Sequence, residues 1–185
     1  MAVQFISALR LKEMSSIHEN VDDTLITPVI LDCQDMYIQP IIGTSLYNEL
    51  KDQITNDTVT VLNTTLLASY VIPCLISYVK YESVTELNFK FTNKNVSKKS
   101  SDNSEPLSTD DSIFLMNKLK DKAEWRAQRI THYLTEYSNS YPLYLNGGSG
   151  LDIIQPSLSN YTCGLVLDDT ECGCDKQNCK CYIYR

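Results

Sequence analysis

The sequence predicts a mainly α-helical fold: a bundle of about four helices with a β-hairpin or extended-loop insertion and a cysteine-rich C-terminal tail. Apolar residues recur at three- and four-residue steps through most of the first 144 residues, which is typical of amphipathic helices. One polar segment rich in Ser, Asn and Lys interrupts this pattern. The residues after a glycine-rich stretch differ in composition and carry closely spaced cysteines.

The length and the net charge of the chain limit which classes of protein it can belong to. A chain of 185 residues can form one domain plus an appendage, and its core needs no metal or disulfide. A net charge of -7 argues against tight wrapping of nucleic acid, which requires clustered Lys and Arg. The N-terminus lacks a signal-peptide pattern, and the apolar stretch Leu66–Val79 is too broken to span a bilayer of about 30 Å. We expect a protein made in a cytosol, without membrane association.

The first two helices are predicted on either side of a Pro/Gly turn. The first begins between Asp22 and Thr27, so that Pro28 lies either at its first position or inside it. Pro40 is expected to stop this helix, and Gly43 to allow the reversal into a second helix capped by Thr44. The expected inner positions are Leu25, Ile26, Val29, Ile30, Cys33, Met36 and Tyr37 in the first helix, and Leu46, Tyr47, Leu50 and Ile54 in the second.

Two longer helices complete the predicted bundle. Residues 63–87 form an apolar helix that Pro73 should kink. The last helix begins at Ser108, which with Asp111 resembles a capping box, and runs to about Ser138. Trp125 is expected at a helix–helix or subunit contact. The expected buried face of this helix is Ile113, Leu115, Leu119, Ala123, Ile130, Tyr133, Leu134 and Tyr137.

The insertion covers about residues 87–108. Leu87, Phe89 and Phe91 alternate with polar residues, which indicates a strand. The segment is either a solvated surface loop or a contact to a neighbouring subunit. The candidate interface residues are Phe89, Phe91, Lys98, Asp102, Asn103 and Trp125.

The change in composition after residue 144 divides the chain into three regions. These are a helical domain over 1–144, a flexible linker over 145–150 and a tail over 151–185. Four tail cysteines could hold a structural zinc ion, with Cys163 as a further participant. Their one-residue spacings are unusual for zinc, and free thiols or disulfides are the alternative. These four cysteines are Cys172, Cys174, Cys179 and Cys181.

The sequence contains no recognisable catalytic motif, and we expect a protein that is not an enzyme. Neither His18 nor His132 has a neighbouring nucleophile and carboxylate. The glycines at 147–150 do not form a nucleophile elbow. Cys33 and Cys74 lie on apolar stripes and are expected in the core.

A family resemblance adds a functional expectation. The run Asn20–Leu50, with its Gln39–Thr44 turn, resembles head–tail connector, or adaptor, subunits of tailed bacteriophages, particularly crAss-like phages. The polar insertion ending in Ser101–Ser104, the helix with Lys122–Arg126 and the aromatic Tyr141–Tyr144 carry the same resemblance. The resemblance covers roughly residues 5–144 and does not include the cysteine-rich tail.

The resemblance implies a virion protein that assembles into a ring, usually of twelve copies, beneath the portal. The implied partners are further copies, the portal protein and tail or second connector proteins. Genomic DNA would pass through the lumen without specific binding, and an acidic lumen would let it slide. The alternatives are a tail-completion or stopper protein and a zinc-binding interaction module.

Overall fold

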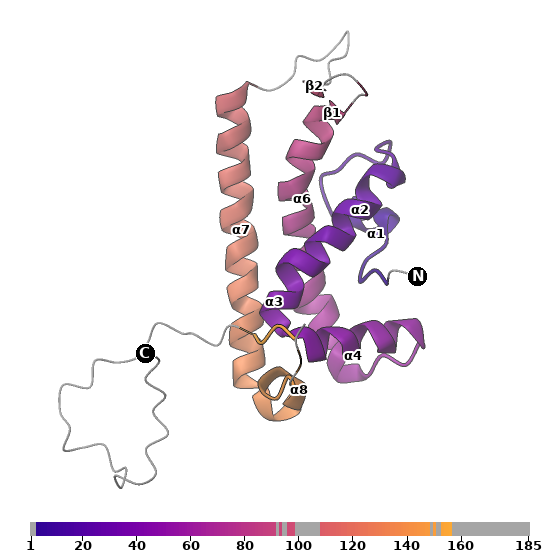
Figure 1. Cartoon of the computed structure of the whole chain (residues 1–185), viewed down its shortest axis with the longest axis vertical. Helices are drawn as coiled ribbons and strands as arrows, with labels where there is room; N and C mark the ends of the chain where they lie inside the picture. Colours follow the sequence, from indigo (N-terminus) through magenta and orange to yellow (C-terminus); the bar gives the residue numbers. More distant parts are fainter. Residues whose placement is uncertain are drawn as a thin grey trace, which may run out of the picture.

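The structure is a computed structural model that describes residues 3–91, 93, 96–98, 108–148, 150 and 153–156. Helix α6 (Ile72–Asn88) lies between α2 (Asp23–Cys33) and α7 (Thr109–Glu136), and it packs against both (Figure 1). The mainly helical fold predicted from the sequence is confirmed. The remaining helical elements are α1 (Ala8–Glu13), η1 (Gln34–Ile38), α3 (Gln39–Ile42), α4 (Thr44–Thr55), α5 (Val61–Leu66), η2 (Leu67–Val71), η3 (Ser138–Ser140) and α8 (Pro142–Leu145).

The first long helix begins at one of the two predicted positions but ends differently from the sequence prediction. The Asp22 side chain accepts a hydrogen bond from the Thr24 N–H at 2.9 Å, so Asp22 is the N-cap and Pro28 lies inside α2. The prediction that Pro40 stops the helix is wrong. The Gln39 N–H donates to the Gln34 carbonyl five residues back and closes the π turn η1, after which Pro40 occupies the first turn of α3.

The reversal after α3 depends on Gly43, which has a φ of +80°. Thr44, predicted as the N-cap of α4, has a different role. Its Oγ1 accepts hydrogen bonds from the Ile154 N–H at 2.9 Å and from Gln39 Nε2 at 3.0 Å. The Thr44 side chain therefore joins the turn to a segment more than a hundred residues away.

The second long helical stretch repeats the combination of a π turn and a proline. The Ile72 N–H donates to the Leu67 carbonyl and closes η2 directly before Pro73. The disturbance predicted at Pro73 thus takes the form of a π turn. By length and composition, Val61–Asn88 could cross a bilayer, but 56% of its most apolar window is buried inside the protein. Core helices of globular proteins share these properties, so length and composition do not place this helix in a membrane.

The insertion contains the predicted antiparallel strand pair. Strand β1 (Phe89–Phe91) pairs with β2 (Val96–Lys98), with Phe89 opposite Lys98 and Phe91 opposite Val96. The predicted N-cap of α7 is confirmed, because Ser108 Oγ accepts from the Asp111 N–H at 3.1 Å. The rest of the insertion lies outside the described residues.

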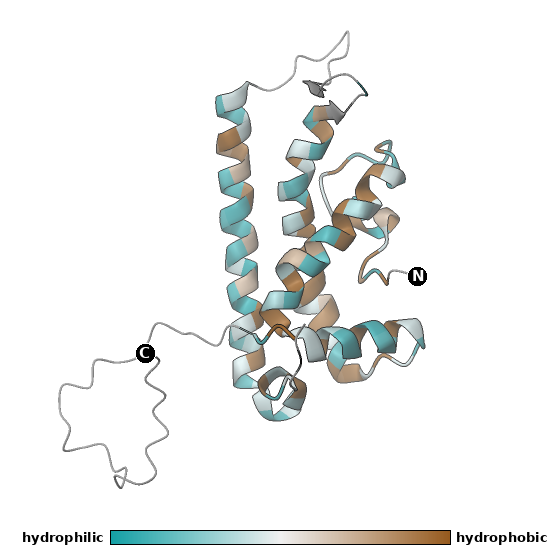
Figure 2. Cartoon of the chain, in the orientation of Figure 1, coloured by the Kyte–Doolittle hydropathy of each residue, from teal (hydrophilic) through white to brown (hydrophobic). Residues whose placement is uncertain are grey.

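The core lies where α2, α4, α6 and the C-terminal half of α7 come together, and the ribbons of these helices alternate between hydrophobic and hydrophilic residues (Figure 2). Ala123, Ile130 and Leu134 of α7 are buried as predicted, whereas Leu119 and Tyr133 are half-buried. Several positions predicted as inner are exposed, because they lie beyond the surfaces that α6 covers. These positions are Leu25, Met36, Ile113, Leu115 and Tyr137.

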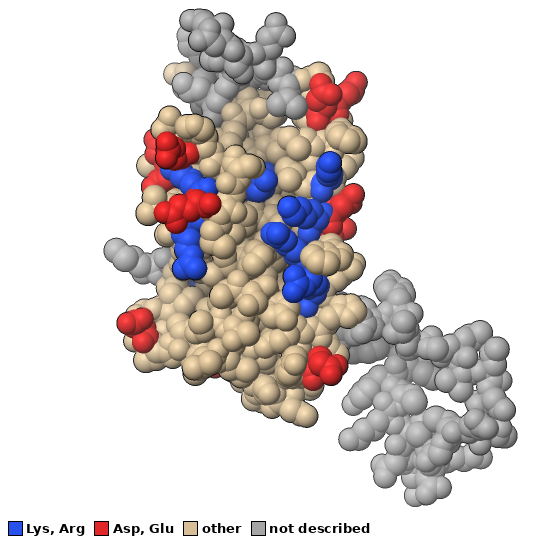
Figure 3. All heavy atoms as spheres, turned by 180° about the vertical axis from the view of Figure 1, so that it is seen from behind, with Lys and Arg blue, Asp and Glu red and all other residues tan. Residues whose placement is uncertain are grey.

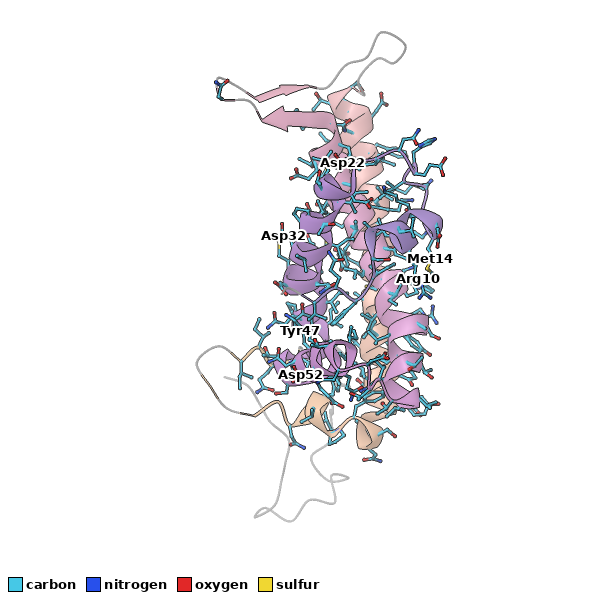
Figure 4. The ribbon with its side chains drawn as sticks, turned by 90° about the vertical axis from the view of Figure 1, so that its right-hand side faces the viewer. Arg10, Met14, Asp22, Asp32, Tyr47 and Asp52 are labelled. Atoms are coloured by element: carbon cyan, nitrogen blue, oxygen red, sulfur yellow. The ribbon has the colours of Figure 1, made fainter. Side chains whose placement is uncertain are left out.

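The N-terminal arm is held by the π turn η1. Gln34 is fully buried; its Oε1 accepts from the Phe5 N–H at 2.7 Å, and its Nε2 donates to the Val3 carbonyl at 3.1 Å. The Phe5 ring packs edge-on against Tyr47 of α4, with ring centroids 5.3 Å apart. Figure 4 shows Tyr47 and Asp52 on the α4 side of the body, below Asp32 of α2.

The residues after α8 pack onto the start of α4. Ser45 Oγ donates to the Gly147 carbonyl, and the Thr44 N–H donates to the Ile154 carbonyl at 2.9 Å. Pro156 is buried. The described residues of the predicted linker and of the first part of the tail therefore belong to the helical body, whose boundary moves from 144 to at least 156. The segment satisfies polar groups of the Gly43 turn, which the glycine-rich composition does not reveal.

We predict that Gly43→Ala destabilises the fold by about 1 kcal/mol or more, because an L side chain is strained at this φ. An added Cβ would also lie 2.8 Å from Pro156 Cδ. Urea unfolding of Gly43→Ala, Pro156→Ala and the double variant measures both effects. The free energy of unfolding lost by the double variant should be smaller than the sum of the losses in the two single variants. Strict additivity would show that Pro156 does not contact the turn in solution.

We predict that Cys33 and Cys74 resist alkylation by iodoacetamide at pH 8 in the folded protein. Burial raises the pKa of both thiols to about 12, outweighing the opposing effect of Arg126 on Cys74. Because the folded-state pKa is raised, the associated stability is present below about pH 9 and is lost as the pH rises toward 12. Peptide mass spectrometry should find both cysteines labelled only in urea. Labelling under native conditions would contradict their burial.

Candidate assembly surface

Helix α7 presents a row of basic side chains on the side that faces away from its buried positions. Lys118, Lys122 and Arg129 are exposed and lie on neighbouring turns of one side of the helix. Seen from behind, Lys and Arg side chains gather along α7 (Figure 3). In a protein with a net charge of -7, this surface is locally basic.

Arg126 belongs to the same helix but has a structural role. Its Nη1 donates to the Pro73 carbonyl and, at 2.8 Å, to Ser77 Oγ, so it fastens α7 to α6. Lys80 of α6 lies nearby and is half-buried. Burial, followed by the positive charges of Lys122 and Arg126, lowers the pKa of Lys80. Lys80 therefore extends the basic row of α7 onto α6.

An aromatic groove lies next to the basic row. Tyr70 of η2 stacks on Tyr133 of α7 with ring centroids 4.2 Å apart, and the Arg129 guanidinium lies 5.2 Å from the Tyr70 centroid and 5.4 Å from that of Trp125. The groove is open to solvent and encloses about 410 Å³. Its lining is completed by Gln128, His132, Glu136 and Tyr137.

Trp125 does not fill a helix–helix contact within the protein, because 57% of its surface is exposed. The other predicted alternative, a subunit contact, stays a prediction. Phe114 is 71% exposed and Ile113 52% on the first turns of the same helix. Large exposed apolar side chains thus occur along much of α7.

A second surface, formed by α2 and α6, carries carboxylates. Lys and Arg are absent from residues 13–50, and Asp32 is exposed on α2 beside the exposed Met36. A small groove of about 80 Å³ lies between α2 and α6. Its lining residues are Val29, Asp32, Cys33, Met36, Glu82 and Glu86.

The wall of this acidic groove is rigidly built. Tyr37 stacks on Tyr78 of α6 with ring centroids 4.1 Å apart and nearly parallel planes, and its hydroxyl donates to Glu82. Burial raises the pKa of Tyr78 to about 12, so this ring pair stays uncharged at neutral pH. The groove therefore offers carboxylates around a small apolar floor.

The other predicted interface residues are only partly described. Phe89 is half-buried in β1, and the structure places Phe91 in β1 and Lys98 in β2. Asp102 and Asn103 lie outside the described residues. Sequence reasoning did not identify Tyr70, Arg129 or Asp32 as site residues, although the spacing of Lys118, Lys122 and Arg129 by four and seven residues was a visible signal for Arg129.

The described part of the chain holds no group of three or more His, Cys, Asp or Glu residues able to bind a metal ion. The predicted zinc ligands Cys172, Cys174, Cys179 and Cys181 lie outside the described residues. The arrangement of the described side chains favours contacts between surfaces, through exposed aromatic rings and two regions of opposite charge.

One comparison with known proteins gives a match. The model of a family of unknown function, DUF6712, matches residues 38–153, more than half of the chain. The matched range includes Gly147, which accepts a hydrogen bond from Ser45, and ends one residue before Ile154. No curated protein and no solved structure gives a significant match.

We predict different effects for two neighbouring arginines of α7. Arg126→Met removes the hydrogen bonds to Pro73 and Ser77 and should lower the free energy of unfolding by about 1.5–3 kcal/mol. Arg129→Met, the matched control, should cost less than about 1 kcal/mol, because Arg129 is exposed and only stacks on rings. Urea unfolding measures both. Equal losses would contradict the separation of a structural from an available arginine.

Proposed function

The chain belongs to the DUF6712 family, and we propose that it is a structural virion protein. In this proposal it is a subunit of a dodecameric ring that joins the portal vertex of the capsid to the tail and extends the DNA channel. The proposal rests on the sequence resemblance to phage connector subunits and on the surface of α7. The partners are copies of the same chain, the portal protein and a tail or second connector protein.

The exposed aromatic and apolar face of α7 is the observation that carries the proposal. Monomeric proteins rarely expose large contiguous apolar surfaces, and such surfaces typically mark interaction sites. Trp125, Phe114 and Ile113 are each more than half exposed on α7, whose buried residues Ala123, Ile130 and Leu134 all lie in its C-terminal part. Trp and Tyr flanked by Arg are also the residue types that dominate protein–protein contacts.

The distribution of charge is consistent with DNA passing through without being bound. Tight DNA binding requires clusters of Lys and Arg that neutralise phosphates. The basic row of α7 lies beside exposed aromatic side chains, a combination that favours burial against protein, and residues 13–50 carry only acidic charges. In the proposed ring the acidic residues face the lumen or an adjoining subunit, and the basic row is covered.

A tail-completion or stopper subunit is a related function in the next layer of the same assembly. It would use the same kind of ring contact, and it differs in its position relative to the portal. Electron microscopy of the intact particle separates the two, because it shows the layer that the chain occupies.

We predict that the purified full chain forms a closed oligomer whose mass is a fixed multiple of 21.0 kDa. Light scattering over a range of concentrations gives the mass, and negative-stain images give the symmetry. Trp125→Glu should weaken assembly at least tenfold, because it places a charge in the proposed contact, whereas Trp125→Phe should retain assembly. A chain that stays monomeric at every concentration, together with no copy at the portal vertex of the particle, would refute the proposed function.

A further inference from the structure

We propose that the ring contact is head-to-tail and pairs the basic face of α7 in one copy with the acidic face of α2 and α6 in the next. The basic face is Lys118, Lys122, Trp125 and Arg129, and the acidic face is Leu25, Asp32, Met36 and Glu82. This inference rests on the proposed function and specifies which surfaces carry it.

The basic face has the geometry of a continuous docking strip. Its four residues follow at spacings of four, three and four, which place them on one side of a helix. Lys118, Lys122 and Arg129 are exposed on the same side of α7 as the half-exposed indole of Trp125, and the Arg129 guanidinium lies 5.4 Å from its ring centroid. An aromatic anchor flanked by cations fits a partner surface with an apolar centre and an acidic rim.

The acidic face supplies this complementary pattern. Met36 is 61% exposed and Leu25 46% exposed, so apolar surface is accessible along α2. Asp32 is exposed next to it, and Glu82 of α6, half-buried and bonded to the Tyr37 hydroxyl, lines the same small groove. A second copy of this chain is therefore an occupant whose charge and apolar surface match.

The two faces can be used at the same time. Helix α6 packs against both α2 and α7, and α2 lies at the front in Figure 1, whereas the basic side chains of α7 are seen from behind in Figure 3. Figure 4 shows Asp32 at the edge that corresponds to this front side. A contact between two different faces continues from copy to copy and closes into a ring when the rotation allows.

A twofold contact between identical faces is disfavoured. Two basic faces would place like charges together, and two acidic faces would do the same, both of which oppose association. Exposed ion pairs contribute little affinity by themselves. The charges therefore set the pairing and its orientation, and burial of Trp125 and Met36 supplies much of the affinity.

A complementation experiment with two blocked variants tests this pairing. Variant one carries Lys122→Glu and Trp125→Glu on the basic face, and variant two carries Asp32→Lys and Met36→Lys on the acidic face. Each variant alone should associate with itself at least tenfold more weakly than the unmodified chain. An equimolar mixture should form a one-to-one heterodimer that does not grow further, because one intact basic face meets one intact acidic face. Light scattering and native mass spectrometry detect this species.

Matched controls change the same charges elsewhere. Lys120→Glu reverses a charge on another side of α7, and Asp52→Lys reverses one on α4; both should assemble like the unmodified chain. Circular dichroism verifies that all variants are folded. Raising the salt concentration should weaken the association of the unmodified chain, since exposed charges are screened beyond about 8 Å at physiological ionic strength.

The outcomes separate this inference from the proposed function. A ring from the unmodified chain, with both blocked variants still assembling, would overturn the face pairing and leave the ring function standing. A ring from the unmodified chain and a mixture without heterodimer would also overturn the pairing. An unmodified chain that never associates would overturn both.

Discussion

The enclosure of α6 between α2 and α7 is the constraint on which the rest of the structure depends. Cys74, Leu75 and Val79 have no exposed surface, and burial of apolar area at roughly 25 cal/mol per Å² drives both neighbouring helices onto α6. Because α2 and α7 are each covered mainly on the side facing α6, their outer sides remain accessible. The difference in charge between these two segments of the sequence thereby becomes a difference between two surfaces of the molecule.

The two π turns show how local backbone geometry serves contacts between distant segments. Each lies just before a proline, and a proline within a helical pattern by itself indicates a stop or a kink. In η1, Gln34 turns inward and bonds the backbone of the N-terminal arm. In η2, Tyr70 turns outward and forms one wall of the aromatic groove. Both irregular turns therefore carry specific side-chain contacts.

The helical fold could be predicted from the sequence, because the three- and four-residue apolar spacing reports directly on helix faces, as Ala123, Ile130 and Leu134 illustrate. Periodicity does not say how far a neighbouring helix extends, so the sequence predicts Ile113 and Met36 as inner positions although nothing among the described residues covers them fully. The candidate site was only partly predicted. Trp125 was identified by its size, whereas its stacking partner Arg129 and the neighbouring Tyr70 come together only through tertiary packing.

The stiffness of this body bears on the number of subunits in the proposed ring. The N-terminal arm bonds to η1, and the segment ending at Pro156 bonds to the Gly43 turn, so both ends of the described chain are tied to the stretch from η1 to the start of α4. Arg126 fastens α7 to α6, and the Tyr37–Tyr78 stack fastens η1 to α6. The two outer faces are therefore held at a fixed relative orientation. In a head-to-tail assembly this orientation sets the rotation from one copy to the next, and a fixed rotation favours one closed ring size over a range of open polymers.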